Sequence, residues 1–187
     1  MFVIGLVGEK GSGKGAFAKI LEEVAKPKQV VPVRTSGLVR ETLDMWHIQP
    51  TRVHLQKLAV IMDQTYGVGT LAEATYQRAI KVEADIIIIE SIRWDADVAL
   101  IRRFPKNVLV YITAPPAVRH VSTISRGEKM GESETTFEQF MEEEKAENEI
   151  HIPRIGALAD YTIRNEGTIE QYKKAITDCY QKHIIEQ

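Results

Sequence analysis

Short apolar runs of strand length alternate with longer amphipathic stretches along this chain. Residues 85–90 (DIIIIE) and 107–113 (NVLVYIT) are apolar at nearly every position, as expected of strands buried on both faces of a sheet. Residues 29–34 (QVVPVR) contain Pro32, which donates no backbone hydrogen bond and therefore suits an edge strand. The opening run 1–7 and the shorter stretch 160–164 complete a set of five predicted strands.

Helical periodicity fills the intervals between these strands. The predicted helices cover residues 14–25, 37–46, 51–64, 69–82, 95–103, 116–126, 136–149 and 168–185. Strands that alternate with helices predict a five-stranded parallel sheet with helices on both faces, a three-layer α/β fold. We expect one domain over residues 1–187, with ligands bound at the carboxyl ends of the strands.

The first predicted strand runs into a glycine-rich segment, residues 8–15 (GEKGSGKG). Gly8, Gly13 and Lys14 occupy the fixed positions of the phosphate-binding loop (P-loop) pattern. Glycines let successive backbone N–H groups point inward at phosphate oxygens, and the following helix adds its positive N-terminal end. The simpler alternative is a strand-to-helix turn with a solvated lysine. The residues expected to contact nucleotide phosphates are Gly8, Gly11, Ser12, Gly13, Lys14, Gly15 and Ala16.

One position of the loop departs from the pattern, because Gly15 stands where Ser or Thr usually offers a hydroxyl to Mg²⁺. Ala16 cannot supply that hydroxyl either. We therefore expect ATP to bring Mg²⁺ that is held mainly by phosphates and water. Glu90, at the end of the isoleucine-rich strand, is the candidate for contact with the metal through water. The structural alternative is that Glu90 pairs with Arg93 or Lys14.

Several arginines follow the predicted strands on the side where ligands bind. Phosphoryl transfer needs positive charge around the moving group more than it needs covalent chemistry. Arg40, Arg52 and Arg93 would suit bidentate clamping of a monophosphate acceptor. A single arginine is more often a solvated or ion-paired surface residue.

A polar segment with two glycines, residues 126–136, lies between two predicted helices. It is interpreted as a small lid that could close over a bound ligand, and the alternative is an ordinary surface loop. Residues 36–82 are interpreted as the acceptor-binding helical region.

The composition limits the classes of partner and site that we expect for this protein. The formal net charge is −2, which gives no electrostatic reason to expect sequence-independent binding to nucleic acid or to an anionic membrane. The lone cysteine, Cys179, excludes an intramolecular disulfide. No stretch is long and apolar enough to span a membrane, and the opening run lacks a basic flank, so a cytoplasmic location is expected. The five histidines show no metal-ligand spacing.

The loop resembles that of adenylate kinases, although Ala16 replaces their threonine. Residues 35–40 (TSGLVR) resemble the adenylate kinase segment in which a hydroxyl and an arginine meet the acceptor nucleotide. Residues 90–93 (ESIR) resemble the acidic strand end with its phosphate-binding arginine.

Over nearly the whole chain the sequence is similar to a small archaeal-type nucleotide-kinase-like family related to dephospho-coenzyme A kinase and to deoxynucleoside monophosphate kinases. The matching stretches are residues 39–41, 51–56, 90–93, 112–119 and 159–168. Asp63 stands near a position that carries arginine in that family.

The resemblance implies a P-loop kinase fold and roles for particular residues. Arg126 would be the lid arginine, and Asn165 would lie near the adenine of the donor. The residues implied to contact the acceptor are Ser36, Arg40, Arg52, Gln56 and Arg93. Those implied to take part in catalysis are Lys14, Glu90, Arg93 and Arg126.

The leading hypothesis is transfer of the γ-phosphoryl of ATP to a nucleoside or deoxynucleoside monophosphate. If the acceptor is instead a hydroxyl, as in dephospho-coenzyme A, a base is wanted and Glu90 is the candidate. A regulatory ATPase without a small acceptor, and a protein that binds nucleotide without turnover, are the remaining alternatives.

Overall fold

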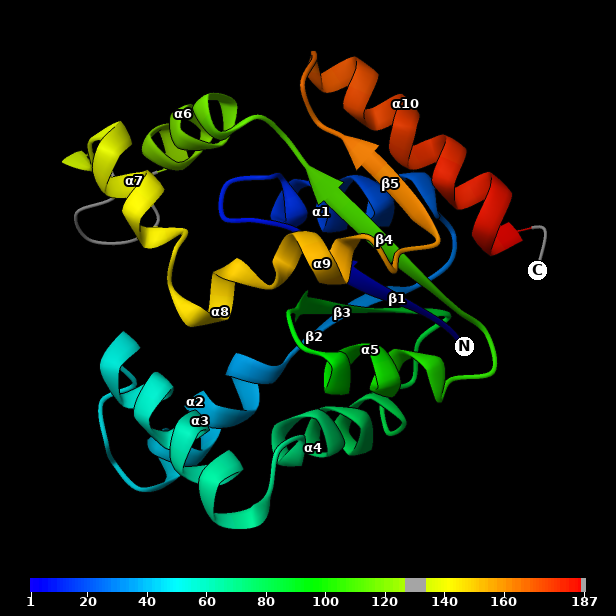
Figure 1. Cartoon of the computed structure of the whole chain (residues 1–187). Helices are drawn as coiled ribbons and strands as arrows, with labels where there is room; N and C mark the ends of the chain where they lie inside the picture. Colours follow the sequence, from blue (N-terminus) through cyan, green and yellow to red (C-terminus); the bar gives the residue numbers. More distant parts are fainter. Residues whose placement is uncertain (127–133, 186–187) are drawn as a thin grey trace.

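The computed structural model describes residues 1–126 and 134–185. Within this part of the chain, five strands form one parallel sheet in the order β2-β3-β1-β4-β5. The strands are β1 (Phe2–Val7), β2 (Val30–Arg34), β3 (Ile86–Ile92), β4 (Asn107–Thr113) and β5 (Tyr161–Arg164). Figure 1 shows the sheet in the middle of the molecule, with helices above and below it. The predicted fold class is therefore confirmed.

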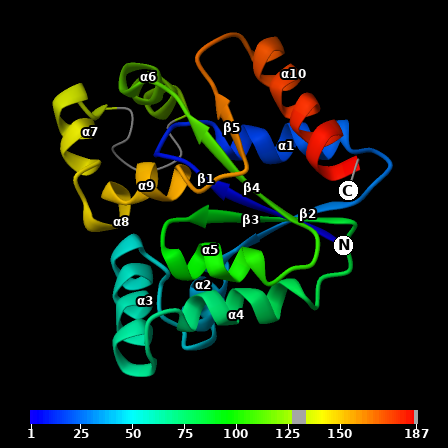
Figure 2. The ribbon, with the colours of Figure 1, turned by 45° about the vertical axis from the view of Figure 1, so that its right-hand side comes forward.

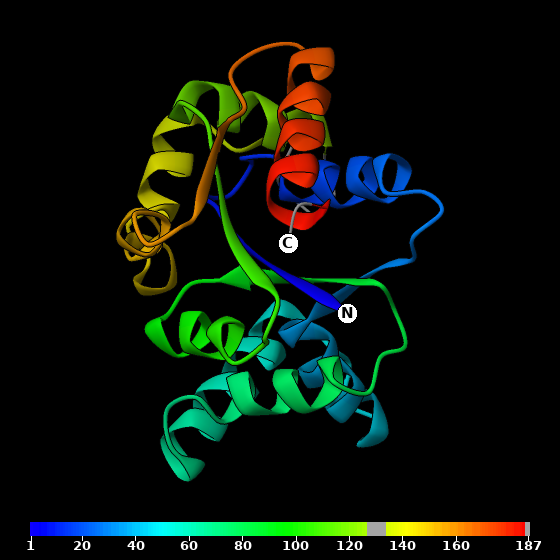
Figure 3. The same cartoon turned by 90° about the vertical axis from the view of Figure 1, so that its right-hand side faces the viewer.

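Helices cover both faces of the sheet. The helices are α1 (Lys14–Val24), α2 (Thr35–Met45), α3 (Arg52–Tyr66), α4 (Thr70–Ala79), α5 (Asp95–Arg102), α6 (Pro116–Arg126), α7 (Phe137–Glu143), α8 (Glu147–Ile150), α9 (Ile152–Gly156) and α10 (Ile169–Tyr180), followed by a π-helical turn, η2 (Gln181–Ile185). Helices α1 and α10 pack on one face, and α4, α5 and α9 pack on the other. Figure 3 shows these two groups separated by the sheet. Helices α2, α3 and α4 pack against one another beside the β2 edge.

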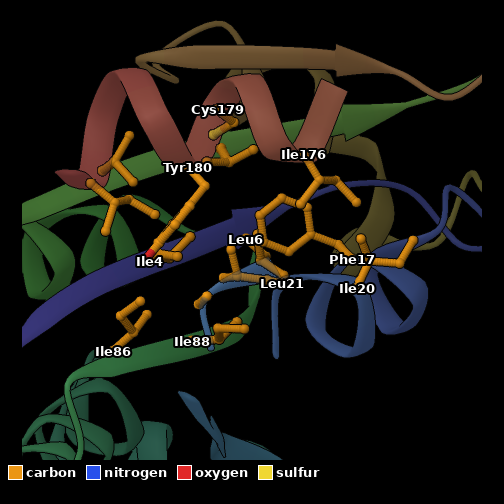
Figure 4. Close-up of a cluster of buried hydrophobic side chains, with 14 of the residues drawn as sticks. Ile4, Leu6, Phe17, Ile20, Leu21, Ile86, Ile88, Ile176, Cys179 and Tyr180 are labelled. Atoms are coloured by element: carbon orange, nitrogen blue, oxygen red, sulfur yellow. The ribbon is translucent and has the colours of Figure 1, made fainter. Parts of the chain in front are cut away.

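The four consecutive isoleucines of β3 explain why both faces are apolar. Side chains alternate across a strand, so Ile86 and Ile88 face the α1/α10 side while Ile87 and Ile89 face the opposite side. All four are fully buried. Figure 4 shows Ile86 and Ile88 beside Phe17 and Leu21 of α1 and Ile176 of α10. The prediction of a strand buried on both faces is confirmed.

Strand β2 lies at one edge of the sheet, as the proline predicted. It pairs with β3 alone, and Pro32 lies opposite Ile88 in that pairing. Strand β3 extends to Ile92, two residues beyond the predicted end, so Glu90 lies within the strand rather than at its last position. No helix among the described residues is both long enough and apolar enough to cross a bilayer.

The predicted helix 136–149 is wrong in one respect, because two helices cover this stretch. Thr136 caps α7 through a reciprocal hydrogen-bonding pair with Gln139. The helix ends at Glu143, Ala146 adopts an extended conformation, and α8 begins at Glu147. The break lets the carboxylates of Glu144 and Glu149 reach two different arginines. The short helix α9 was not predicted. The lid expected at 126–136 falls largely outside the described residues.

Candidate functional site

The glycine-rich loop connects β1 to α1, and Lys14 is the first residue of that helix. The Lys14 ammonium folds back over the loop, where Nζ donates hydrogen bonds to the carbonyl oxygens of Gly8 (2.6 Å) and Glu9 (2.8 Å). The loop thus curls around its own lysine beside the N-terminal end of a helix. This arrangement suits an anionic ligand, because backbone N–H groups and the helix dipole both favour negative charge there.

Three glycines are required by the geometry of the loop. Gly11 has a φ of +77°, and a Cβ at this position would lie 2.3 Å from the carbonyl oxygen of Arg119. Gly13 has a φ of +110°, and a Cβ at this position would lie 2.5 Å from the side-chain nitrogen of Asn165. A Cβ at Gly8 would lie 2.4 Å from the carbonyl oxygen of Ile112. Gly15 differs, because a Cβ there would meet nothing within 4 Å. The space that Ser or Thr would fill in the usual pattern is therefore present beside Gly15.

Side chains from distant parts of the chain support the loop. Asn165 Nδ2 donates to the carbonyl oxygen of Ser12 (3.0 Å), and the hydroxyl of Tyr172 donates to the carbonyl oxygen of Gly13 (3.1 Å). Ser12 is itself fully buried, and its backbone N–H donates to the carbonyl oxygen of Glu9. Asn165 was predicted at the site from resemblance, whereas sequence reasoning missed Tyr172.

Glu9 is a second residue that sequence reasoning missed. Its carboxylate accepts hydrogen bonds from the hydroxyls of Tyr111 and Thr113 on β4. Burial and the neighbouring Glu9 carboxylate raise the pKa of Tyr111 to about 12, so the phenol remains a donor at neutral pH. The sequence alone does not indicate that a glutamate inside a glycine-rich loop has this anchoring role.

The surroundings of Lys14 lower the pKa of its ammonium group. Burial, together with the positive charge of Arg93, lowers the pKa of Lys14 from 10.5 to about 8, against the opposing effect of the carboxylates of Glu149, Glu9 and Glu90. Lys14 and Arg93, predicted from separate motifs, are therefore within electrostatic reach of each other. An anion bound between them would relieve the repulsion between the two cations.

Glu90 is paired with a residue that the sequence interpretation did not consider as its partner. Arg34 donates through Nε to Oε2 of Glu90 (2.7 Å) and through Nη2 to Oε1 (3.2 Å). The two residues lie opposite each other in the register of β2 and β3. The structural alternative, in which Glu90 pairs with Arg93 or Lys14, is therefore corrected, because its hydrogen-bonding partner is Arg34. Both oxygens of this buried carboxylate are engaged by one guanidinium.

Arg93 follows β3 directly and is held from several sides. Its guanidinium forms an ion pair with Glu149 of α8 (3.1 Å). Its backbone N–H donates to Asp97 Oδ2 (2.9 Å), which also accepts from the N–H of Trp94 (3.0 Å). Trp94 packs against His151, with ring centroids 5.1 Å apart. The backbone of Arg93 is thus fixed by the start of α5, while its charged group meets α8.

Arg119 of α6 is a further cation beside the loop. It is almost fully buried, and its guanidinium contacts the carbonyl oxygens of Ala114 and Lys10 and the carboxylate of Glu144. Phe140 of α7 lies under both Arg119 and Lys10, with cation-to-centroid distances of 5.6 and 5.8 Å. Lys10 also pairs with Glu143 (2.8 Å). Segment α7–α8 therefore brings three glutamates to three cations around the loop, and Figure 2 shows this segment beside it.

The structure brings only some of the residues predicted to bind the acceptor to this site. Ser36 and Arg40 on α2 and Gln56 on α3 are exposed, and within the described residues their side chains make no hydrogen bond or ion pair with the loop. The side chains of Arg52 and Arg126 lie outside the described part of the structure. Asp63, at the position where the resemblance implied arginine, lies near enough to Asp97 to raise the pKa of that carboxyl, an effect secondary to burial.

The carboxylates and histidines of the described residues do not gather into a direct metal site. No cluster of three or more His, Cys, Asp or Glu side chains in the described ranges could bind a metal directly, and both Glu90 oxygens face Arg34. A hollow of about 610 Å³ lies beside α7, lined by Glu134, Thr135, Gln139, Glu142 and Glu143. Its three carboxylates make it unsuited to phosphates.

Solved structures with the same fold include P-loop kinases. The APS kinase CysC of Mycobacterium tuberculosis, in complex with AMPPNP and APS, aligns over 97% of this chain and 98% of its own, with a TM-score of 0.58 and 13% identity. The shikimate kinase of Acinetobacter baumannii, in complex with shikimate, aligns over 97% and 90% with a TM-score of 0.54 and 14% identity. At this identity the similarity shows the fold alone.

Sequence relatives are more similar. The UPF0200 protein of Hyperthermus butylicus is 28% identical over 171 residues, which covers 91% of this chain and 89% of the relative. The UPF0200 protein PH1008 of Pyrococcus horikoshii is 30% identical over 186 residues, covering 96% of each chain. No family model matches the chain. The identity to PH1008 over nearly the full length of both proteins shows that this chain belongs to the UPF0200 family.

Proposed function

We propose that this protein is an ATP-dependent phosphotransferase whose acceptor is a small nucleotide, a nucleoside or deoxynucleoside monophosphate. The observation that carries the proposal is the loop at the start of α1, where Lys14 is enclosed by the carbonyl oxygens of Gly8 and Glu9 and lies within electrostatic reach of Arg93. Two cations at the carboxyl ends of β1 and β3 suit a donor phosphate and an acceptor phosphate that meet between them.

Each residue has a proposed role in this scheme. The loop from Gly8 to Gly13 cradles the donor phosphates, and Lys14 neutralises charge on the β- and γ-phosphates. Arg93 fixes the acceptor phosphate so that one of its oxygens lies in line with the γ-phosphorus. Arg126 would contribute positive charge from the lid, and Asn165 would lie near the donor base. Arg40, Arg52, Ser36 and Gln56 complete the proposed acceptor contacts.

When Mg²⁺ is bound with ATP, it supplies further neutralisation of the phosphates. The protein's own contribution there is the open space beside Gly15, where a side chain is absent and nothing lies within 4 Å of a Cβ position. This space leaves room for phosphate-bound metal and its water shell.

The state of Glu90 favours a phosphate acceptor over a hydroxyl acceptor. A hydroxyl must lose its proton to a base, whereas a phosphate monoester oxygen is already ionised at neutral pH. Glu90 is the candidate base, and both of its oxygens accept hydrogen bonds from Arg34. A substrate hydroxyl would therefore have to compete with this guanidinium for the same two oxygens.

A coupled assay that follows ADP release tests the proposal. Purified protein is supplied with ATP, Mg²⁺ and a panel of nucleoside and deoxynucleoside monophosphates, with dephospho-coenzyme A and shikimate as hydroxyl acceptors. We expect one monophosphate to stimulate ADP release by about tenfold or more over the rate without acceptor. Hydrolysis that is indifferent to every acceptor would instead support a regulatory ATPase, and calorimetric ATP binding without turnover would support a nucleotide-binding protein that is not an enzyme.

A further inference from the structure

The chain between α7 and α9 crosses the site as a bridge, which we define as residues 145–151. Its two ends are fixed by buried apolar side chains. Phe140 of α7 is fully buried beside Lys10 and Arg119, and Ile152 and Ile155 of α9 are buried in the core on the α4/α5 side of the sheet. Between these anchors lies only α8, a single turn that carries Glu149.

The ion pairs of this region differ in how far they are shielded from solvent. The side chains of Arg119 and Glu144 are 6% and 19% exposed, and Arg119 is also held by the carbonyl oxygens of Ala114 and Lys10. Breaking a nearly buried pair of this kind is costly, so this contact fixes the chain immediately before the bridge. Arg93 is 32% exposed and its partner Glu149 is 17% exposed. The pair at the centre of the bridge is therefore the one more open to competition from a ligand.

Glu149 already provides an anionic partner for the guanidinium of Arg93. Its carboxylate lies 3.1 Å from the guanidinium and is the carboxylate with the largest effect on the charge of Lys14. A phosphate monoester carries up to two negative charges and three acceptor oxygens, against one charge and two oxygens for a carboxylate, so it binds the guanidinium more strongly. A bound phosphate would also repel the remaining carboxylate.

We propose that Glu149 is an internal substitute for a phosphate on Arg93 and that it selects ligands, because only a phosphate-bearing acceptor can displace it. This inference rests on the proposed function and specifies its substrate class. A neutral acceptor has no charge with which to compete for Arg93, so Glu149 stays in place and α8 stays over the site. A phosphate monoester takes Arg93, and the released α8 moves between its two fixed ends.

Trp94 provides a direct report of this exchange. It neighbours Arg93 in sequence and packs against His151, two residues after Glu149 on the bridge. The second tryptophan, Trp46, is exposed at the end of α2. In a Trp46→Phe background, the emission of Trp94 therefore follows the position of the bridge.

The test compares Glu149→Gln with Glu142→Gln in that background, using inorganic phosphate and AMP as charged probes and adenosine as the neutral probe. Glu142 lies in the same acidic segment and pairs with Lys145, with both side chains 71% exposed, so its substitution changes net charge equally without touching the site. We expect phosphate and AMP, but not adenosine, to change Trp94 emission. Glu149→Gln should tighten phosphate binding by roughly tenfold, and Glu142→Gln should leave it unchanged.

The double variant Arg93→Ala/Glu149→Gln tests whether Glu149 acts through Arg93. If it does, the Glu149→Gln change no longer tightens phosphate binding once Arg93 is absent. The inference is overturned if Glu149→Gln binds phosphate as the parent does, if Glu142→Gln gains equally, or if the gain survives in the double variant. Calorimetry with MgATP on the same samples distinguishes failure of this inference from failure of the proposed function. ATP binding with an unchanged phosphate affinity rejects the role of Glu149 alone, whereas absent ATP binding rejects the proposed function.

Discussion

The hydroxyl of Tyr172 on α10 donates a hydrogen bond to the backbone carbonyl oxygen of Gly13, 3.1 Å away and 159 residues earlier in the sequence. The same carbonyl oxygen accepts the first helical hydrogen bond of α1, from the N–H of Phe17. The glycine-rich loop and α10 are therefore joined at the residue where the chain turns into α1. Burial raises the pKa of Tyr172, so this hydroxyl keeps its proton at any physiological pH.

Replacing Tyr172 with Phe should lower the free energy of unfolding by about 1 kcal/mol, the usual net contribution of one hydrogen bond. The loss should not be larger, because Phe17 still satisfies the Gly13 carbonyl. Urea denaturation measures the change. The matched control is Tyr66→Phe, at an exposed tyrosine of α3, and equal stability of the two variants would contradict a structural role for the Tyr172 hydroxyl.

Replacing Gly13 or Gly15 with alanine should have different effects on the stability of the protein. Gly13→Ala places a Cβ 2.5 Å from Asn165 on a backbone with a φ of +110°, and should cost about 2 kcal/mol or more of stability. Gly15→Ala meets no neighbour and lies in the first turn of α1, so it should be neutral or stabilise by about 0.5 kcal/mol. Thermal unfolding of both variants checks the pair, and equal destabilisation would rule out the loop geometry described above.

Removing the ammonium of Lys14 should abolish phosphoryl transfer while the fold persists. Lys14→Ala is expected to reduce the rate by roughly a hundredfold or more, because the developing charge on the donor phosphates loses its partner. Lys19→Ala, at an exposed position of the same helix, serves as the control. Circular dichroism verifies the fold, and an unimpaired rate in Lys14→Ala would remove this lysine from the mechanism.

Nucleotide binding should take up a proton in mildly alkaline solution. The pKa of Lys14 is lowered to about 8, so at pH 8.5 most of the unliganded protein carries a neutral amine. A bound polyphosphate favours the ammonium form and raises this pKa, so a proton enters on binding and affinity falls as pH rises from 7 to 9. Calorimetry at pH 8.5 in two buffers of different ionisation enthalpy measures the uptake. Lys14→Arg stays charged and should show none.

Arg93→Ala should raise the KM for the acceptor by about tenfold or more and leave the KM for ATP nearly unchanged, because the guanidinium is proposed to clamp the acceptor phosphate. Arg154→Ala is a suitable control, since Arg154 and its ion-pair partner Asp95 are both exposed. Steady-state kinetics with each substrate varied in turn gives both constants. A comparable rise in both would exclude a role specific to the acceptor.

The fold and the loop were predictable because their signals are local. A run of four isoleucines needs no distant partner to indicate burial on two faces, and Gly8, Gly13 and Lys14 are recognisable from their spacing alone. The ion pairs were not predictable, because they depend on which strands and helices become neighbours. Arg34 and Glu90 meet only because β2 lies beside β3 in that register, and the sequence pattern does not specify strand order. The break between α7 and α8 likewise follows tertiary contacts that outweigh helical periodicity.

The central sheet separates the supports of the phosphate loop from the helices beside the β2 edge. Phe17, Leu21 and Tyr172 belong to the core on the α1/α10 side, whereas α4 contributes Ala72 and Ala79 to the core on the other side. Substitutions across α2, α3 and α4 could therefore reshape the proposed acceptor pocket without disturbing the supports of the glycine-rich loop. A scaffold partitioned in this way would let members of the family vary one half while the other half stays constant.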